Sequence, residues 1–236
     1  MIATTDNYKR LEYFSINVAA DSRRKEFDIK NHSLIYEKKR PNFLFIGDSI
    51  THYWELNSYF YQNNKLIVNR GIEGDTTTFL CKRFYVDAIQ LQPEYCILGI
   101  GINDSIELEG DYWKCLEPKP YDEVVETAKA NLLDIISQAQ KANIKLIIAS
   151  ILPINIPISL HEEARIQYVK DINNWLEKVA KEKELIYIDY YQALIDTKTE
   201  KIKDGTTYDG LHPNAIGYGI MADVLRKTLK ENNINI

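Results

Sequence analysis

The chain has 236 residues, of which 45% are hydrophobic and 27% are charged, so it can bury a sizeable core and lacks the composition of a disordered protein. Its 29 Lys and Arg against 34 Asp and Glu give a net charge of −5, which argues against a protein that binds nucleic acid through bulk charge. No apolar run approaches the roughly 18 residues of a membrane span, so no span is expected.

The cysteines and the first residues bear on the cellular compartment. Cys81, Cys96 and Cys115 have neither pairing nor metal-ligand spacing, which is typical of free thiols in a reducing environment. Residues 1–10 contain no apolar segment of the kind that a secretion signal needs. We therefore expect a cytoplasmic protein.

The N-terminal part of the chain precedes the first regular pattern. Residues 1–40 are charged and loosely periodic, and the segment 22–27 fits a helix; we expect this part to be an extension packed on the outside of the fold. Short, nearly uninterrupted apolar runs then recur along the chain. Such runs are typical of strands buried on both faces of a parallel sheet. They predict five strands, at residues 42–46, 66–69, 95–100, 145–151 and 185–188.

Longer segments with helical periodicity separate these strands. Apolar residues three and four apart predict amphipathic helices at residues 76–90, 121–141 and 161–183, with a closing helix at 215–229. Residues 104–120 lack periodicity and predict a long loop. Because no repeat or linker interrupts the alternation, the sequence predicts one α/β domain over residues 1–236, with helices on both faces of a five-stranded parallel sheet.

Polar, glycine-containing segments follow several of the predicted strands. They lie at residues 47–51, 69–75, 101–104 and 209–213. Because ligands of such sheets collect beyond the carboxyl ends of the strands, we expect these segments to gather at one edge. Together they contain a hydroxyl, an imidazole, a carboxylate, a side-chain amide and backbone N–H groups, which are the groups that acyl transfer through a serine requires.

Three of these segments carry recognisable motifs. Gly-Asp-Ser-Ile occupies residues 47–50, Gly-x-Asn-Asp residues 101–104 and Asp-x-x-His residues 209–212. With these motifs in this order, the chain resembles the SGNH, or GDSL, hydrolases, a family of esterases, lipases and acylhydrolases with a flavodoxin-like three-layer α/β/α sandwich. The resemblance extends from residue 42 to about residue 220.

The resemblance implies a role for each polar residue. Ser49 would be the nucleophile, His212 its base and Asp209 the group that orients His212. The backbone N–H groups of Ser49 and Gly71 and the amide of Asn103 would form the oxyanion hole. The expected substrate is a small carboxylic ester, acetyl or short-chain, on a sugar or a lipid, and we expect neither a metal nor a cofactor.

Each of these residues also has a structural explanation. Ser49 could cap a helix, His212 could lie at the surface, and Asn103 and Gly71 could be turn residues. Their joint occurrence at the strand ends favours the catalytic interpretation. A serine hydroxyl needs a neutral imidazole to take its proton as it attacks, and the sequence supplies both groups.

Other motifs are incomplete. No serine has glycine at both of the positions that an α/β-hydrolase nucleophile requires, and residues 99–104 lack the third glycine of a dinucleotide loop. Residues 161–165 lack the second histidine of a zinc helix, and His52 is expected to pack on the far side of its helix.

Substrate specificity is less well defined by the sequence. We expect Tyr112, Trp113, Leu152 and Ile154 to shape the substrate pocket. The 16 tyrosines are compatible with a glycan cleft and with a homodimer interface. Two alternatives to hydrolysis stay open: a non-hydrolytic acyl- or glycan-binding protein on the same fold, and an acyltransferase that uses the same residues.

Overall fold

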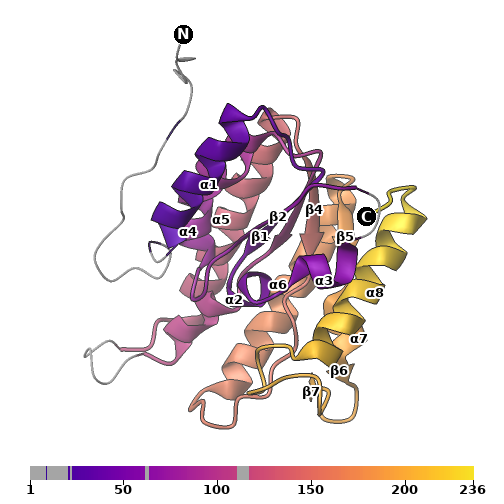
Figure 1. The fold of residues 1–236 in the computed structure, drawn as a ribbon. Helices are drawn as coiled ribbons and strands as arrows, with labels where there is room; N and C mark the ends of the chain where they lie inside the picture. Colours follow the sequence, from indigo (N-terminus) through magenta and orange to yellow (C-terminus); the bar gives the residue numbers. More distant parts are fainter. Residues whose placement is uncertain (1–8, 10–20, 22, 62–63, 111–116) are drawn as a thin grey trace.

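The computed structural model describes residues 9, 21, 23–61, 64–110 and 117–236, and its centre is a parallel sheet of five strands in the order β2-β1-β3-β4-β5 (Figure 1). The strands are β1 (Phe43–Gly47), β2 (Ile67–Gly71), β3 (Tyr95–Gly99), β4 (Lys145–Ala149) and β5 (Ile186–Ile188). All five predicted strands are confirmed, each within two residues of the expected ends. β1 is buried along its whole length, as a central strand covered on both faces must be.

Helices cover the sheet on both faces (Figure 1). One layer contains α4 (Thr77–Asp87), α5 (Tyr121–Lys141) and α6 (Glu162–Glu182). The other contains α2 (Ser49–His52), α3 (Leu56–Phe60) and α8 (Ala215–Glu231). The predicted three-layer α/β/α sandwich is therefore confirmed.

The long helices follow their apolar periodicity closely. α5 has the predicted bounds, and its core-facing residues are all buried: Val124, Val125, Ala128, Leu132, Ile135, Ile136 and Ala139. α6 is one residue shorter at each end than predicted and α8 extends two residues further. α4 ends at Asp87, and the rest of the predicted segment forms a 3-10 helix over Ile89–Leu91.

Short elements differ from the prediction. Part of the predicted loop at 104–120 is a 3-10 helix, Asn103–Leu108, in which the Ser105 hydroxyl donates to the Ile102 carbonyl at 2.6 Å. α7 (Tyr190–Leu194) and the two-stranded β6 (Ile195–Asp196) and β7 (Lys201–Ile202) were not predicted. Elements of two to six residues are too short to show a helical or strand period, which is why sequence patterning misses them.

α1 (Arg24–Tyr36) precedes the sheet and lies beside α4 (Figure 1). Its Phe27 is fully buried, and the guanidinium groups of Arg23 and Arg70 lie 4.8 and 4.9 Å from the Phe27 ring centroid. α1 is thereby attached to β2, the edge strand.

The carboxyl ends of three strands lie at the same level of the sheet. Gly47 of β1 pairs in register with Gly71 of β2 and with Gly99 of β3. The segments that leave these strands therefore start side by side, and the polar residues that follow them meet at one edge of the sheet.

Candidate active site

Ser49 is the first residue of α2 and is separated from β1 by a single residue, Asp48. Asp48, not Ser49, caps this helix: its Oδ1 atom accepts from the Ile50 N–H at 3.0 Å. The helix-capping explanation for Ser49 is therefore wrong, because Asp48 holds the N-cap position and Ser49 is already the first residue inside the helix. The Ser49 hydroxyl is left for another partner.

That partner is His212. The distance from His212 Nε2 to Ser49 Oγ is 2.9 Å, although 163 positions separate the two residues in the sequence. The other ring nitrogen, Nδ1, lies 2.7 Å from Asp209 Oδ2. The structure thus brings the three residues that the resemblance singled out into one continuous chain of hydrogen bonds.

Asp209 hydrogen-bonds to the backbone of its own turn as well as to the His212 ring. Its Oδ1 atom accepts from the backbone N–H groups of Leu211 at 3.0 Å and of His212 at 2.8 Å, so each carboxylate oxygen has a separate task. Burial alone would raise the pKa of Asp209, but the hydrogen bonds from His212 and Leu211 hold it below its usual value. Asp209 is thus an ionised hydrogen-bond acceptor at neutral pH.

Asn103 begins the 3-10 helix after β3 and is buried. Its Nδ2 atom donates to the Asp75 carbonyl at 2.9 Å, which fixes the orientation of the amide. An amide nitrogen carries two hydrogens, so one donor remains for a ligand. Asn103 therefore connects the segment after β3 to the segment after β2.

Gly71 does not fit the expected role of a free donor. Its N–H donates to Asn69 Oδ1 at 2.8 Å, and a Cβ atom at this position would lie 2.2 Å from the His52 nitrogen. The glycine is needed because the backbone of α2 crosses β2 at this point. The expectation that the Gly71 N–H forms part of the oxyanion hole is corrected, because that hydrogen is already engaged.

Gly74 is the better candidate for a backbone donor in the same segment. It has a φ of +73°, a conformation that favours glycine, and it directly precedes Asp75, whose carbonyl binds Asn103. Within the described part of the chain its N–H has no hydrogen-bond acceptor. Sequence reasoning missed it, although Gly-Asp in a predicted turn is a signal for a special backbone conformation.

A buried ionic network holds the segments around Ser49 and Asp75 in place. The Arg83 guanidinium, on α4, lies 2.7 Å from Asp75 Oδ2 and 3.1 Å from Asp87 Oδ2, and it donates to the Gly47 carbonyl at 3.1 Å. Arg24 of α1 reaches the same Asp87 oxygen at 3.1 Å. Arg83 therefore binds the segment before Ser49 and the segment that orients Asn103.

Two buried carboxyl groups hold the loops. Asp104 accepts from the backbone N–H of Thr77 at 3.1 Å, and burial raises its pKa to about 6. Burial likewise raises the pKa of Asp48 to about 7, and the nearby Asp75 and Asp104 carboxyl groups add to this effect. Both groups thus favour the protonated form more than an exposed aspartate does.

The raised pKa of Asp48 predicts a pH-dependent stability. Because the folded protein binds this proton more tightly than the unfolded chain, the stabilisation is complete below about pH 4 and is lost as pH rises to about 7. Asp48→Asn keeps a capping oxygen but cannot ionise. Between pH 5 and pH 8 the free energy of unfolding of the unaltered protein should decrease. We expect the decrease to be about 2 to 4 kcal/mol smaller in Asp48→Asn.

Urea unfolding at four pH values between 5 and 8 measures this difference. The exposed Asp204, changed to Asn, is the matched control, and its pH curve should follow that of the unaltered protein. Parallel curves for Asp48→Asn and the unaltered protein would show that Asp48 titrates normally.

The expectation that Leu152 and Ile154 line the substrate pocket is wrong. Leu152 and Ile154 are 2% and 1% exposed and belong to the hydrophobic core, so neither can contact a substrate at the surface. Leu152 lines an internal cavity of about 30 Å³, which holds no more than a water molecule. Tyr112 and Trp113 lie outside the described residues.

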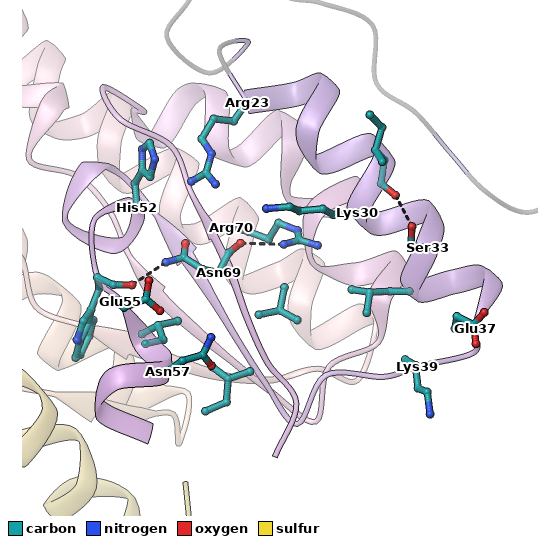
Figure 2. A pocket seen from close by; sticks show the side chains of 16 residues that line it. Arg23, Lys30, Ser33, Glu37, Lys39, His52, Glu55, Asn57, Asn69 and Arg70 are labelled. Atoms are coloured by element: carbon teal, nitrogen blue, oxygen red, sulfur yellow. Dashed lines mark hydrogen bonds between the residues drawn. The ribbon is translucent and has the colours of Figure 1, made fainter. Parts of the chain in front are cut away.

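The far side of α2 forms a separate groove of about 580 Å³ beside β2 (Figure 2). Figure 2 shows His52 and Arg23 at one end of this groove and Glu37 and Lys39 at the other. Burial lowers the pKa of His52, and the Arg23 charge lowers it further. His52 thus lines a different hollow from His212, as expected for a residue that packs away from Ser49.

The described residues contain neither a cluster of metal ligands nor a helix suited to cross a membrane. Over residues 23–61, 64–110 and 117–236, no group of three or more His, Cys, Asp or Glu side chains is placed to hold a metal ion. In the same ranges, no helix combines the length and the apolar character that crossing a bilayer requires.

Comparison with known proteins places this arrangement in context. The model of the GDSL-like lipase/acylhydrolase family matches residues 45–220, which include every residue of the site. A comparison with curated protein sequences gives no match.

Solved structures share the fold. A GDSL-like lipase from Bacteroides thetaiotaomicron superposes with a TM-score of 0.72 at 26% identity, over 88% of this chain and 97% of that one. An acetylxylan esterase from Geobacillus stearothermophilus gives a TM-score of 0.63 at 19% identity, over 80% of this chain and 94% of the esterase.

Proposed function

Since this chain belongs to the GDSL-like lipase/acylhydrolase family of ester-cleaving hydrolases, we propose that it hydrolyses a small carboxylic ester through an acyl intermediate on Ser49. One observation carries the proposal: His212 lies 2.9 Å from the Ser49 hydroxyl and 2.7 Å from the Asp209 carboxylate. A hydroxyl, an imidazole and a carboxylate in this order are the groups that activate a serine for attack on a carbonyl carbon.

Acylation starts with the Ser49 hydroxyl. Its oxygen forms a bond to the carbonyl carbon of the ester while its proton passes to His212 Nε2. The carbonyl oxygen becomes an oxyanion. The tetrahedral intermediate then collapses: the bond between the carbonyl carbon and the alcohol oxygen breaks, and the leaving oxygen takes the proton from Nε2. The alcohol departs and the acyl group stays on Ser49.

Deacylation repeats these steps with water. Water attacks the acyl carbon and gives its proton to His212 Nε2, and the bond to Ser49 Oγ breaks as that proton returns to the serine. The products are the free serine and a carboxylic acid. In both half-reactions Asp209 keeps the hydrogen on Nδ1, so that Nε2 is the nitrogen that exchanges protons.

The oxyanion needs hydrogen-bond donors that are in place before the reaction. We assign this role to the backbone N–H of Ser49, the Asn103 amide and the backbone N–H of Gly74. Ser49 is the first residue of α2, where N–H groups have no acceptor within the helix. Asn103 retains one free hydrogen, and Gly74 replaces Gly71 because the Gly71 N–H is bound to Asn69.

Labelling with a fluorophosphonate tests the proposed function directly. The probe forms a covalent bond with an activated serine oxygen, and we expect peptide mass spectrometry to find it on Ser49. Prior incubation with excess p-nitrophenyl acetate should slow the labelling. Label on another serine such as Ser105, or on none while the protein stays folded, would contradict the assignment.

A further inference from the structure

The groove of Figure 2 lies along the free edge of the sheet, because β2 is the outermost strand and pairs only with β1 among the described strands. We call it the edge groove. Residues Ile67 to Arg70 of β2 line it, with α1 on one side and the segment of α2 and α3 on the other. An unpaired strand edge presents N–H and C=O groups that can bind another extended chain.

The pairing with β1 determines which backbone groups of β2 face the groove. The Phe43 N–H donates to the Leu66 carbonyl at 3.2 Å, so the even-numbered residues along β2 turn their backbone groups toward β1 and the odd-numbered residues turn theirs away. Among the described residues, the Ile67 N–H, the Ile67 carbonyl and the Asn69 N–H have no hydrogen-bond partner. The edge therefore offers two donors and one acceptor in a row.

Two arginines close the edge beyond Asn69. Arg70 Nη1 donates to the Asn69 carbonyl at 2.9 Å, and Arg23 Nη1 donates to the Gly71 carbonyl at 2.9 Å. The Gly71 N–H is bound to the Asn69 side chain. A strand that paired with β2 would thus have to end beside Asn69, where its last residue would meet the two guanidinium groups.

The end of the groove at these arginines carries an excess of positive charge. Arg23 and Lys30 share one carboxylate, that of Glu26, whose Oε1 atom lies 2.8 Å from Arg23 Nη2 and 2.6 Å from Lys30 Nζ. Arg70 is 3% exposed and has no ion pair in the described part of the chain; its Nε donates to the neutral Asn31 amide at 2.9 Å. Three cations and one carboxylate leave an excess of two positive charges.

Arg70 is the group that an anion would neutralise. Burial lowers the pKa of Arg70 to about 10, so the guanidinium is still protonated at neutral pH. Its Nη2 atom has no hydrogen-bond partner among the described residues, which leaves a charged donor for a ligand. Figure 2 shows the two acidic residues that line the groove, Glu37 and Glu55, set apart from Arg70 and Lys30.

The walls of the edge groove are apolar on both sides of β2. Ile29 and Leu34 of α1 form one wall, and Leu56 of α3 belongs to the other. Successive side chains of an added strand point to opposite faces of the sheet, so its last two residues would each meet apolar side chains. Free backbone groups, apolar walls and a cationic end together fit an extended peptide that ends in a carboxylate.

We propose that the edge groove binds the C-terminal segment of a partner protein, which adds to β2 as a parallel strand and places its terminal carboxylate on Arg70 and Lys30. In this register the N–H of the last residue donates to the Ile67 carbonyl, and the carboxylate accepts from the Asn69 N–H. The carbonyl two residues earlier accepts from the Ile67 N–H. An antiparallel strand would place its C-terminus at the opposite end of β2, away from the cations.

This site is separate from Ser49 and His212, so the inference goes beyond ester hydrolysis and does not depend on it. Acetylated tetrapeptides test it on the full-length protein. One pool has free carboxylates and Val, Ile, Leu, Phe or Thr at each of the last two positions, and a second pool has the same sequences with C-terminal amides. Each pool passes through gel filtration with the protein, and mass spectrometry identifies the peptides that co-elute.

We expect the protein to retain free acids and not amides. By calorimetry, the best acid should bind at least about 10-fold more tightly than its own amide, because only the acid brings a charge to Arg70. Retention of no acid, or equal affinity of acid and amide, would overturn the proposal. Inorganic phosphate that binds as tightly as the best acid would show a simple anion site instead.

Methylation of single peptide nitrogens tests the register. An N-methyl group on the last residue removes the hydrogen that would bind the Ile67 carbonyl, and it should weaken binding about 10-fold or more. An N-methyl group on the preceding residue, whose N–H points away from β2, is the matched control and should change the affinity by less than about 3-fold. Equal losses from the two methyl groups would exclude a parallel strand on this edge.

Substitutions of two lysines test the cationic end. Lys30 is 55% exposed in its side chain, so Lys30→Gln should leave the fold intact. It should weaken binding of the acid about 5-fold without changing the affinity for the amide. Lys39→Gln removes the same charge at the other end of the groove and should stay within about 2-fold. Equal effects of the two variants would contradict a carboxylate site at Arg70 and Lys30.

A second copy of this chain is the competing occupant of the edge. Light scattering measures the molar mass of the protein with and without the best acid peptide. We expect the peptide to bind without changing the molar mass. A dimer that retains no peptide would assign the edge of β2 to contact between copies and overturn the proposal.

Discussion

Ser49→Ala is expected to lower kcat/KM for p-nitrophenyl acetate by at least about 10⁴-fold, because losing the nucleophile of such a triad leaves only binding and the oxyanion donors. Ser49 is buried, and its hydroxyl contributes one hydrogen bond, to His212 Nε2. Removing one oxygen from a buried site without enlarging any side chain should leave the fold intact. Initial rates, with circular dichroism on the same samples, give the comparison.

Substitution of an exposed serine outside the site is the matched control for Ser49→Ala. Ser58 is exposed on α3, outside the hydrogen-bond chain, so Ser58→Ala should retain the activity of the unaltered protein. If Ser49→Ala keeps more than a tenth of the original kcat/KM, the acyl-serine route is wrong. A loss shared by both variants would instead indicate damage to the fold near α2.

The sheet was predictable because its strands are buried on both faces. Residues 43–47 are all buried, and a short uninterrupted apolar run is how such a strand appears in a sequence. α5 was predictable to the residue because its seven buried positions repeat with helical spacing over 21 residues. α2, with four residues, has no period to detect, so only the coordinates define it.

The candidate site was predictable where side chains carry the chemistry. Ser49, Asp209 and His212 have functional groups that recur in fixed order, and the hydrogen bonds now join them. The backbone donors were not predictable in the same way. Gly71 and Gly74 belong to the same segment, and in the structure the bond from the Gly71 N–H to Asn69 and the positive φ of Gly74 distinguish them.

The buried ionic network around Arg83 could have been predicted in part from the sequence. Arg83 and Asp87 are one helical turn apart and share the buried face of α4 with Leu80 and Phe84. Charged residues at core-facing positions of an amphipathic helix are rare unless they are paired, so they predict a buried ion pair. The pattern does not reveal that Arg83 also binds the Gly47 carbonyl, because that contact spans 36 positions.

Leu152 and Ile154 were expected to line the substrate pocket, but they are buried in the core. Both follow β4 at the edge where ligands collect, which made a role in the substrate pocket reasonable. Their side chains point into the core instead, and apolar character alone does not distinguish a pocket wall from core packing.

Asp209→Asn is expected to lower kcat by up to about 10⁴-fold while the fold is retained, because it changes which nitrogen of His212 carries the hydrogen. Oδ1 of Asp209 accepts from two backbone N–H groups, and Oδ2 accepts from His212 Nδ1. An asparagine that keeps the backbone bonds must turn its NH₂ group toward Nδ1. That ring nitrogen would then have to accept, so Nε2 would carry the hydrogen and could not take the proton of Ser49.

Turning the new amide over would restore the hydrogen to Nδ1 only at the cost of two backbone hydrogen bonds. If the amide turned over to present its oxygen to Nδ1, its NH₂ group would face the N–H groups of Leu211 and His212, at a cost of about 1 kcal/mol or more for each lost bond. Rates on p-nitrophenyl acetate at several pH values, with Asp223→Asn at an exposed aspartate as control, measure the effect. A kcat within 10-fold of the unaltered protein would mean that Asp209 supports the turn but does not set the hydrogen position on His212. Because the Asp209 side chain is 52% exposed, water can then replace it as the acceptor for Nδ1, and the reaction would depend on Ser49 and His212 alone.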